Sequence, residues 1–449
     1  MGITETLARY VVETEYKQIP EEARRVAKQV VLDGLANMLA GSREPLASVL
    51  LQYLKKIGGP ETSTIIGHNL RSSLLNAAFA NGIFCHCMDF EMMWYPPTHP
   101  TSPTLSPALS LGEWLNLSGS DLIAALVLGF EVQGRLRLAS PLGHAGFHPP
   151  GTVGVMGSAA TCAKLLNLDV QRTRWALGIA GSRAGAITAN IGTMTKSSHC
   201  GNAARMGLEA ALMAAEGWTA NEDIIEAEDG FGAVLFPPGA FKFDLVVKDF
   251  GRPYRMVSPG LSIKMFPAQY PTHWPIVASL EVRREHGLDP KEIERVEVIT
   301  GDQIATRKLR PKTGLEGKFS IPYVVSAALL DGKVVIDTFT DARRFAPDIE
   351  QMLGKVHIIL DPSIDPYDFA TAWCQVTVRL KDGTSYSARC DKPPGHFMRP
   401  ISLEEHEVKF RECAKRVLEE PAVDHVLEVV RSLEHLQDVA SLLQMLRVG

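Results

Sequence analysis

The sequence predicts a mainly α-helical protein in which a large all-helical domain, formed by both ends of the chain, is interrupted by a smaller α+β domain. Three observations lead to this prediction. Apolar residues recur at helical spacing through the first half of the chain, strand-like alternation begins only after about residue 262, and helical spacing returns from Ser402. The 449 residues suffice for more than one core. We therefore place the helical domain at residues 1–262 and 399–449 and the α+β domain at residues 263–398.

Residues 20–41 give the clearest helical pattern. Pro20 suits the first position of a helix, and the acidic pair Glu21 and Glu22 favours the positive end of the helix dipole. One apolar stripe follows at helical spacing, made of Ala23, Ala27, Val31, Leu35 and Met38. Gly41 then supplies a C-cap. Similar patterns, many rich in Ala and Gly that let helices approach closely, predict helices at 71–82, 121–138, 154–166, 169–184 and 202–217.

The α+β domain is predicted from alternating segments at 292–300 and 375–380. Asp382-Gly383 is a two-residue turn signal that joins the second segment to a strand at 384–390 as a hairpin. Helical patterns at 322–330 and 341–352 lie between these strands.

Composition excludes several classes of function. The net charge of −5 gives no electrostatic footprint for nucleic acid or for an anionic membrane surface. No apolar run is long enough for a membrane helix, and the first residues lack the apolar region of a secretory signal. Seven cysteines, an odd number without a CxxC pair, are typical of reduced thiols. We therefore expect a cytoplasmic protein with a small-molecule partner.

Histidines concentrate in four segments that Gly or Pro interrupts. These segments start at His86, His144, Met194 and Lys264, and they hold six of the thirteen histidines. Histidine is the side chain whose ordinary pKa lies where protons move at neutral pH, and Gly and Pro mark loops that present functional groups. The pattern predicts proton-transfer chemistry at a pocket assembled from distant segments.

Two spacings are typical of metal sites, and we expect neither to bind metal. In Cys85-His86-Cys87, adjacent side chains point apart on a helix or a strand, so buried, inert cysteines are the better interpretation. His144 and His148 have the i, i+4 spacing of zinc ligands, but Gly146 and Pro149 argue against a helix there. His144 is therefore expected to be structural. The sequence also offers no evident three-cysteine iron–sulfur site.

Polar residues in these segments are the candidates for chemistry. Asp89 and His99 flank the turn Tyr95-Pro96-Pro97, which would allow the carboxylate to orient the imidazole as a base. The alternative is a capping Asp and a surface His. Lys196 precedes a helix that we expect to start near Asn202, where free N–H groups and the dipole attract carboxylates. The alternative is a solvated lysine.

Further candidates lie in the α+β domain. His273 stands at its predicted start, where an interdomain pocket would form. Tyr323 opens a predicted helix, and a buried tyrosine often needs only a hydrogen-bond partner, so a structural role is its alternative. Lys264 and Lys318 are candidate contacts for substrate carboxylates.

Several of these segments, taken in order, resemble the MmgE/PrpD family, which includes 2-methylcitrate dehydratases, cis-aconitate decarboxylases and an iminodisuccinate epimerase. The resemblance runs through nearly the whole chain, on PEEARRVAKQVVLDGLANMLAG, NGIFCHCMDFE followed by THP, TKSSHCGNAARMGLEA and KFSIPYVVSAALLDG. MDFEMMWYPPTHP, HPPGTVGVMGSAA and FPAQYPTHW look most like the aconitate decarboxylase branch.

The resemblance implies which residues line the active site. By their match to that branch they are Asp89, His99, His148, Lys196, His273 and Tyr323. The branch also has a Thr four residues after the Asp, where this chain has Met93, a departure that bears on the substrate rather than on the fold. The family further implies that the smaller domain is a lid, that the protein is a homodimer, and that it uses no metal or organic cofactor.

The expected function is that of a lyase acting on a small di- or tricarboxylate. Family reactions share a carbanion or enolate stabilised by an adjacent carboxylate, reached by loss of CO₂ in a decarboxylase or of a proton in a dehydratase. We expect Lys196 to bind carboxylate and His99, oriented by Asp89, to carry the proton. Alternatives are an epimerase of a dicarboxylate such as iminodisuccinate, a non-catalytic metabolite-binding paralogue, which Met92 and Met93 would favour, and a metal-dependent hydrolase.

Overall fold

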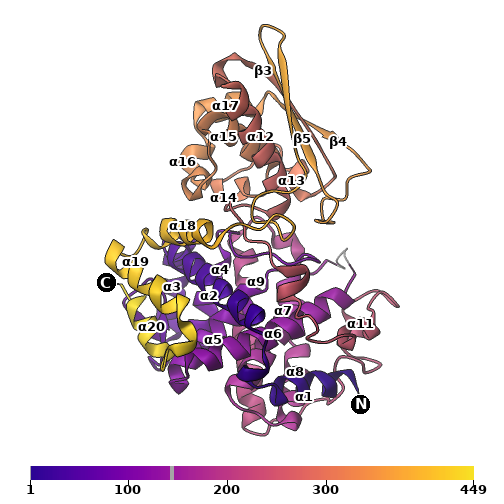
Figure 1. Ribbon diagram of the computed structural model, residues 1–449, viewed down its shortest axis with the longest axis vertical. Coiled ribbons are helices and arrows are strands. Elements are labelled where there is room, and N and C mark those ends of the chain that lie inside the picture. The colour runs from indigo at the N-terminus through magenta and orange to yellow at the C-terminus, as the bar shows by residue number, and fades with distance from the viewer. Residues whose placement is uncertain (1, 142–145, 449) are drawn as a thin grey trace. The chain divides into compact units, whose positions relative to one another are not determined.

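The structure is a computed structural model that describes residues 2–141 and 146–448. His144 therefore lies outside the described residues. The chain is mainly α-helical with a small β component, and it divides into two compact units (Figure 1). Unit 1 comprises Met1–Cys87, Glu91–Leu261 and Ser402–Gly449, and unit 2 comprises Met88–Phe90 and Ser262–Ile401. The sequence did not predict that three residues of the first histidine segment would group with unit 2.

Unit 1 consists mostly of helices that pack through small residues. A Cβ added at Gly82 would lie 3.0 Å from the Cα of Gly201, so the helices that carry these two glycines approach closely, as the sequence predicts. The helices of unit 1 are α1 (Ile3–Glu13), α2 (Glu21–Gly41), α3 (Pro45–Ile57), α4 (Leu74–His86), α5 (Thr101–Leu115), α6 (Gly119–Ala139), α7 (Pro149–Leu165), α8 (Val170–Gly181), α9 (Met194–Ala215), α10 (Phe231–Val234), α11 (Phe243–Val247), α18 (Leu403–Ala414), α19 (Glu420–Arg431) and α20 (Val439–Met445).

Helix α2 confirms the clearest prediction, and its predicted apolar stripe is buried. The role of Gly41 differs from the expected one. Gly41 is the last helical residue rather than the cap, and a Cβ there would lie 2.0 Å from the carbonyl oxygen of Phe84 in α4. The glycine is therefore needed for the close approach of α4, the helix that ends at His86.

Two details of unit 1 depart from the sequence prediction. Unit 1 is not purely helical, because a short antiparallel hairpin joins β1 (Ser63–Ile65) to β2 (Leu70–Ser72); strands of this length have too few residues to show alternation. Helix α9 begins at Met194, well before Asn202, because Gly201 lies inside the helix at a helix contact instead of marking its start. Lys196 thus lies in the first turn of α9.

Unit 2 contains a four-stranded sheet with the order β4-β3-β5-β6. Strands β3 (Ile293–Thr300), β5 (Cys374–Leu380) and β6 (Ser385–Cys390) confirm the predicted strands, and β5 and β6 form the predicted hairpin. Strand β4 (Val356–Leu360) pairs in parallel with β3 and was not predicted, because most of its residues are exposed or only half-buried at the sheet edge. Helix α12 (His273–His286) packs on β5 and β6 (Figure 1).

The remaining helices of unit 2 surround a small apolar core. Helix α15 (Ile321–Asp331) contacts α12 and α17 (Pro347–Leu353). The helix predicted at 341–352 is split into α16 (Asp341–Arg344) and α17, because Pro347 has no N–H to continue the first helix. Short helices α13 (Ile304–Arg307) and α14 (Gly314–Gly317) precede α15.

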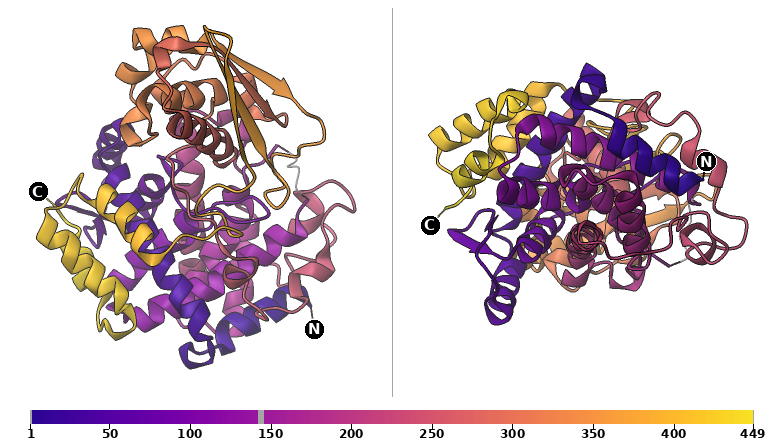
Figure 2. Two further views of the ribbon diagram at one scale, coloured as in Figure 1. Left: turned by 45° about the horizontal axis from the view of Figure 1, so that its top comes forward. Right: turned by 90° about the horizontal axis from the view of Figure 1, so that it is seen from below.

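The two ends of the chain meet within unit 1. Helix α18 contacts α2, and α20 contacts α5; Figure 2 shows these yellow C-terminal helices beside the indigo and purple N-terminal ones. A capping box at Ser402 and Glu405 starts α18, as the return of helical spacing at Ser402 predicts. Nowhere in residues 2–141 and 146–448 does a helix have the length and apolar character needed to cross a membrane.

Candidate active site

Four separate segments of unit 1 place basic side chains in one buried cluster. His86 is the last residue of α4, and His99 lies in the loop before α5. His148 is the N-cap of α7, held there because Pro149 fixes the first helical position, and Lys196 lies in the first turn of α9. All four side chains are buried. The structure thus brings together three residues that the sequence predicted, and adds His86.

The imidazole rings of this cluster contact one another. The ring centroids of His86 and His99 lie 4.5 Å apart, those of His86 and His148 lie 5.6 Å apart, and those of His148 and His199 lie 5.4 Å apart. Such proximity places several groups that can donate or accept protons around one small region of unit 1. This is the arrangement that proton-transfer chemistry at an assembled pocket requires.

A carboxylate, an imidazole and an ammonium group stand in line within the cluster. Glu91 Oε1 lies 2.6 Å from His86 Nδ1, and His86 Nε2 lies 2.8 Å from Lys196 Nζ. The same Glu91 oxygen lies 3.8 Å from His99 Nδ1. Ser102 donates to Glu91 through its backbone N–H and its hydroxyl, both at 2.7 Å. Glu91 therefore caps the N-terminus of α5, where the helix dipole stabilises its negative charge.

His199 is a site residue that the sequence analysis did not single out. Its Nδ1 lies 3.3 Å from Nδ1 of His148. Burial, and then the nearby charge of Lys196, lower the pKa of His199 to about 4, so that this imidazole is neutral at neutral pH. The signal was available: Lys196 and His199 are three residues apart, which places them on one face once the helix is known to start at Met194.

Glu91 and His86 were also missed. The sequence Cys85-His86-Cys87 predicts buried, inert cysteines and assigns no role to His86, and Cys85 and Cys87 are indeed buried. Burial and the neighbouring charge of Glu91 raise the pKa of the Cys85 thiol well above its usual value, so Cys85 is inert. The available signal for Glu91 was an acidic residue in a segment whose other residues are almost all apolar.

The cluster has groups that a metal ion could use, a possibility that sequence spacing did not predict. Among the described residues, one ligand atom each of His86, His99 and His148 lie within 4.8 Å of one another, as do those of His86, Glu91 and Cys200. Both ring nitrogens of His86, however, lie within hydrogen-bond distance of another side chain, Glu91 or Lys196. A metal bound to His86 would have to displace one of these partners.

Unit 2 holds a second set of predicted residues, centred on Asp89. Asp89 adopts a left-handed backbone with φ 52°, which aspartate tolerates better than most residues. Fully buried Lys264 donates to the carboxylate of Asp89, to its carbonyl oxygen at 2.9 Å and to the carbonyl oxygen of Ala268 at 3.1 Å. Lys318 donates to the carbonyl oxygens of Met88 and Pro267. Both lysines thus hold residues 88–90 in unit 2.

His273 and Tyr323 are both fully buried in unit 2. The ring of His273 lies against those of Phe266 and Tyr270, with centroids 5.2 and 5.1 Å away. The hydroxyl of Tyr323 donates to the carbonyl oxygen of Thr338, and its ring belongs to the apolar core of unit 2. Burial raises the pKa of this hydroxyl, so it stays protonated at neutral pH. These contacts agree with a structural role for Tyr323, which is the alternative that the sequence analysis gives.

Met93 is buried in unit 1, in the loop between α4 and α5. Its neighbour Met92 donates its backbone N–H to Asp33 at 3.1 Å, and Trp94 donates to the carbonyl oxygen of Thr98 at 3.0 Å. These two bonds fix the backbone on either side of Met93. The position from which the Met93 side chain extends is therefore fixed, which a side chain that shapes a pocket requires.

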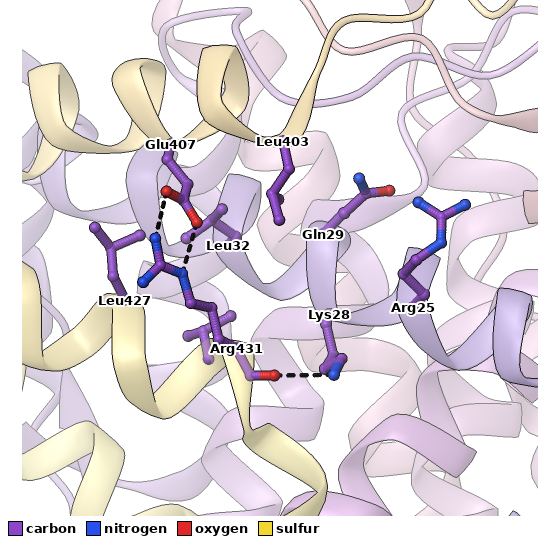
Figure 3. Close-up of a pocket in the computed structure, with 9 residues that line it drawn as sticks. Arg25, Lys28, Gln29, Leu32, Leu403, Glu407, Leu427 and Arg431 are labelled. Carbon is purple, nitrogen blue, oxygen red and sulfur yellow. Dashed lines mark hydrogen bonds and ion pairs between the residues drawn. The ribbon is translucent and has the colours of Figure 1, made fainter.

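A hollow of about 240 Å³ between α2, α18 and α19 makes a useful contrast (Figure 3). Its floor is apolar, with Leu32 and Leu427 among its residues. Three of its charged residues are paired: Arg431 donates twice to Glu407, at 2.8 and 2.6 Å, and Lys28 donates to the carbonyl oxygen of Arg431. None of the described residues that line it is a histidine, so these residues do not offer the proton chemistry of the buried cluster.

Comparison with known proteins identifies relatives across both units. Residues 5–244 match the model of the MmgE/PrpD N-terminal domain, and residues 266–435 match that of the MmgE/PrpD C-terminal domain. The chain is 34% identical to the cis-aconitate decarboxylases of Mus musculus and Homo sapiens, covering 99% of this chain and 93% and 95% of theirs. A 2-methylcitrate dehydratase of Yarrowia lipolytica is 23% identical over 90% of this chain and 82% of its own.

Proposed function

This chain belongs to the MmgE/PrpD family, and we propose that it is a carboxy-lyase that releases CO₂ from cis-aconitate or a closely related tricarboxylate. The observation that carries the proposal is the buried cluster of His86, His99, His148 and Lys196 in a chain whose full length resembles cis-aconitate decarboxylases. A trianionic substrate needs cationic and hydrogen-bonding groups, and the cluster supplies them.

Charge stabilisation is the first task of the cluster in this proposal. Breaking the C–COO⁻ bond leaves an electron pair on carbon, which the neighbouring double bond and carboxylate delocalise. Lys196 binds a substrate carboxylate and stabilises the charge that develops there, an effect strengthened by burial of the side chain. Electrostatic stabilisation of this kind is usually the largest single contribution to the rate.

Proton delivery is the second task. Each CO₂ that leaves must be replaced by one proton on the carbanion, which keeps atoms and charge in balance. We assign this proton to His99, whose Nδ1 lies 3.8 Å from Glu91 and whose ring contacts His86. The family resemblance assigns Asp89 as the orienting acid, together with His148, His273 and Tyr323, to the same reaction, and Lys264, Lys318 and Met93 to substrate binding; these roles are proposals.

We propose that the reaction needs no metal or organic cofactor, because His86, the residue common to both candidate metal groups, is already hydrogen-bonded at both nitrogens. Dialysis against a chelator should leave turnover unchanged. Stoichiometric zinc or iron in active protein, with activity lost to the chelator, would contradict the proposal. A cytoplasmic homodimer with unit 2 as its lid is the further expectation from the family.

A dehydratase is the second candidate, favoured by the similarity to a 2-methylcitrate dehydratase and by Met93. A buried apolar side chain at that position suits the methyl branch of 2-methylcitrate, whereas Thr would offer a hydroxyl donor to a polar group. Dehydration would form a carbanion of the same kind by loss of a proton instead of CO₂, and the β-hydroxyl would then take up a proton and leave as water.

The two candidates are separated by incubating the protein in D₂O with cis-aconitate, 2-methylcitrate, citrate and iminodisuccinate, and by following the products by NMR. We expect CO₂ release from cis-aconitate, with one deuterium on the carbon that is protonated. Water loss from 2-methylcitrate without decarboxylation of cis-aconitate would establish the dehydratase instead. Deuterium exchange or inversion of iminodisuccinate alone would establish the epimerase, and inertness toward all four would favour a non-catalytic role.

A further inference from the structure

We propose that Glu91 and His86 are positioning residues that hold the ammonium group of Lys196 in place for the substrate. The inference rests on the proposed carboxylate chemistry and extends it to two residues that the sequence analysis did not include. The geometry that carries it is the line from Glu91 Oε1 through His86 to Lys196 Nζ, with separations of 2.6 and 2.8 Å.

The chemistry of the three groups fixes the direction of the hydrogen bonds. A lysine ammonium has only donors, so His86 must accept at Nε2 and carry its hydrogen at Nδ1, from which it donates to Glu91. Glu91 thereby selects the tautomer of His86 that Lys196 needs.

The anchor of this line is rigid. Glu91 is fully buried, and the backbone N–H and hydroxyl of Ser102 each bond one of its carboxylate oxygens at 2.7 Å. The N-terminus of α5 thus fixes the carboxylate, the carboxylate fixes the ring of His86, and the ring fixes the lysine. Lysine is flexible, with about 2 kcal/mol of side-chain entropy, so holding it before the substrate arrives improves binding.

The hydrogen bond to His86 leaves Lys196 with further donors. An ammonium group has three donors, so it can bond one imidazole nitrogen and still contact a substrate carboxylate. The line also explains how Glu91 can be buried as an anion, because its charge is balanced by Lys196 across the neutral ring. We infer that the three residues act as one unit, and that removing His86 matters chiefly through Lys196.

A double-mutant cycle tests this dependence. His86→Leu should lower kcat/KM for cis-aconitate by about 10- to 100-fold, the loss of one charged hydrogen bond, mainly through a higher KM. Made in a Lys196→Met background, the same change should lower kcat/KM by less than about 3-fold, because the lysine that His86 positions is already gone. Equal factors in both backgrounds would overturn the proposal.

Rescue and a matched control separate positioning from structure. His86→Gln retains an acceptor near Nε2 and should recover about tenfold of the loss in His86→Leu. His406 is another buried imidazole bonded to a carboxylate, and His406→Gln should leave kcat/KM within about 3-fold while it lowers Tm. Equal damage from His86→Gln and His86→Leu at similar Tm would contradict the positioning role.

A binding measurement keeps this inference separate from the proposed reaction. Tricarballylate has no double bond and cannot follow the proposed decarboxylation, so its Kd by calorimetry reports carboxylate binding alone. If wild type binds it and the cycle in Kd is non-additive, the positioning role stands even when cis-aconitate is not turned over. If wild type turns over cis-aconitate but the cycle in Kd is additive, the positioning role is wrong and the proposed function stands.

Discussion

Unit 1 contains two buried sets that each combine an acidic residue, a histidine and a lysine, connected in different ways. In the set made of Asp33, His406 and Lys409, both basic side chains meet a single carboxylate oxygen, Oδ1 of Asp33, at 3.3 and 2.6 Å. In the set made of Glu91, His86 and Lys196, the imidazole stands between the acid and the lysine. The combination of an acidic residue, a histidine and a lysine does not by itself distinguish the roles of the two sets.

The different hydrogen-bond arrangements of the two sets indicate different roles. Asp33 joins α2 to α18 and also accepts the backbone N–H of Met92, so its set ties the chain ends to the loop of the candidate site. Burial alone would raise the pKa of Asp33, but the charge of Lys409 and the hydrogen bond from His406 lower it overall. The negative charge of Asp33 is thus balanced by side chains of the protein itself. The Glu91 set instead ends in a lysine beside other imidazoles, which suits a ligand.

The largest expected effect is on stability, in the Asp33 set. Asp33→Asn keeps the acceptor for Met92 but leaves the buried ammonium of Lys409 without its counter-charge, so unfolding free energy should fall by about 3–5 kcal/mol. Urea unfolding followed by circular dichroism measures this. The control is Glu434→Gln, which breaks the partly exposed pair with Lys28 and should cost below about 1 kcal/mol. Similar losses in the two variants would remove the distinction.

The next effect is on catalysis, at His99, which lies beside the Glu91 set. His99→Ala should lower kcat by about 10²-fold or more, the usual contribution of a general acid or base, with little change in Tm. Steady-state kinetics with cis-aconitate measures it. Near-normal kcat in a well-folded variant would exclude His99 as the proton carrier.

A smaller effect concerns the pH dependence of stability at His199, which lies against His148. Burial lowers the pKa of His199 to about 4, below the ordinary value of about 6.5, so the unfolded chain takes up a proton before the folded one does. Unfolding free energy should therefore fall as pH decreases from about 6.5 to 4, by about 2 kcal/mol or less from this residue. His199→Gln should reduce that dependence without abolishing it, because burial also lowers the pKa of His68, and that of His396 to about 4.

The control for this prediction is His286→Gln, since His286 is exposed and stacks on Tyr386. That variant should keep the pH dependence of wild type. An identical slope in wild type and His199→Gln would show that His199 does not stay neutral in the folded protein.

A further expected effect concerns substrate choice at Met93. Met93→Thr should shift the ratio of kcat/KM for cis-aconitate to that for 2-methylcitrate toward cis-aconitate, because a buried hydroxyl can donate to a substrate oxygen and a methionine cannot. The expected change is about 1–3 kcal/mol of discrimination. Parallel assays of the two substrates measure it, and a ratio within about twofold of wild type, below ~0.4 kcal/mol, would show that Met93 does not face substrate.

Regular elements were predictable where one local signal dominated. The apolar stripe of α2 and the Asp382-Gly383 turn each specify their element. Helix α5 was not predicted, because it contains Pro107 in its interior and forms only where buried packing outweighs the poor helix propensity of that residue. The true start of α9 was hidden for a related reason: Gly201 weakens the local signal but permits the contact with α4.

Several residues of the candidate site could be predicted from the sequence, but the hydrogen bonds between them could not. His99, His148 and Lys196 were selected from the sequence, and the structure brings them together in unit 1. Glu91 and His86 were not, because their importance lies in hydrogen bonds to Ser102 and Lys196 that no local pattern reveals. Residue spacing does not separate the two buried acids, Asp33, which joins α2 to α18, and Glu91, to which we assign a positioning role.

One pair of substitutions tests this division most directly: Lys196→Met and Lys409→Met, each assayed for kcat/KM with cis-aconitate and for Tm. Each substitution removes the buried ammonium group of one of the two sets. We predict that Lys196→Met lowers kcat/KM by at least about 10-fold with a small change in Tm, and that Lys409→Met lowers Tm while kcat/KM stays within about 3-fold. Equal loss of kcat/KM in both variants, or the reverse assignment, would contradict the account.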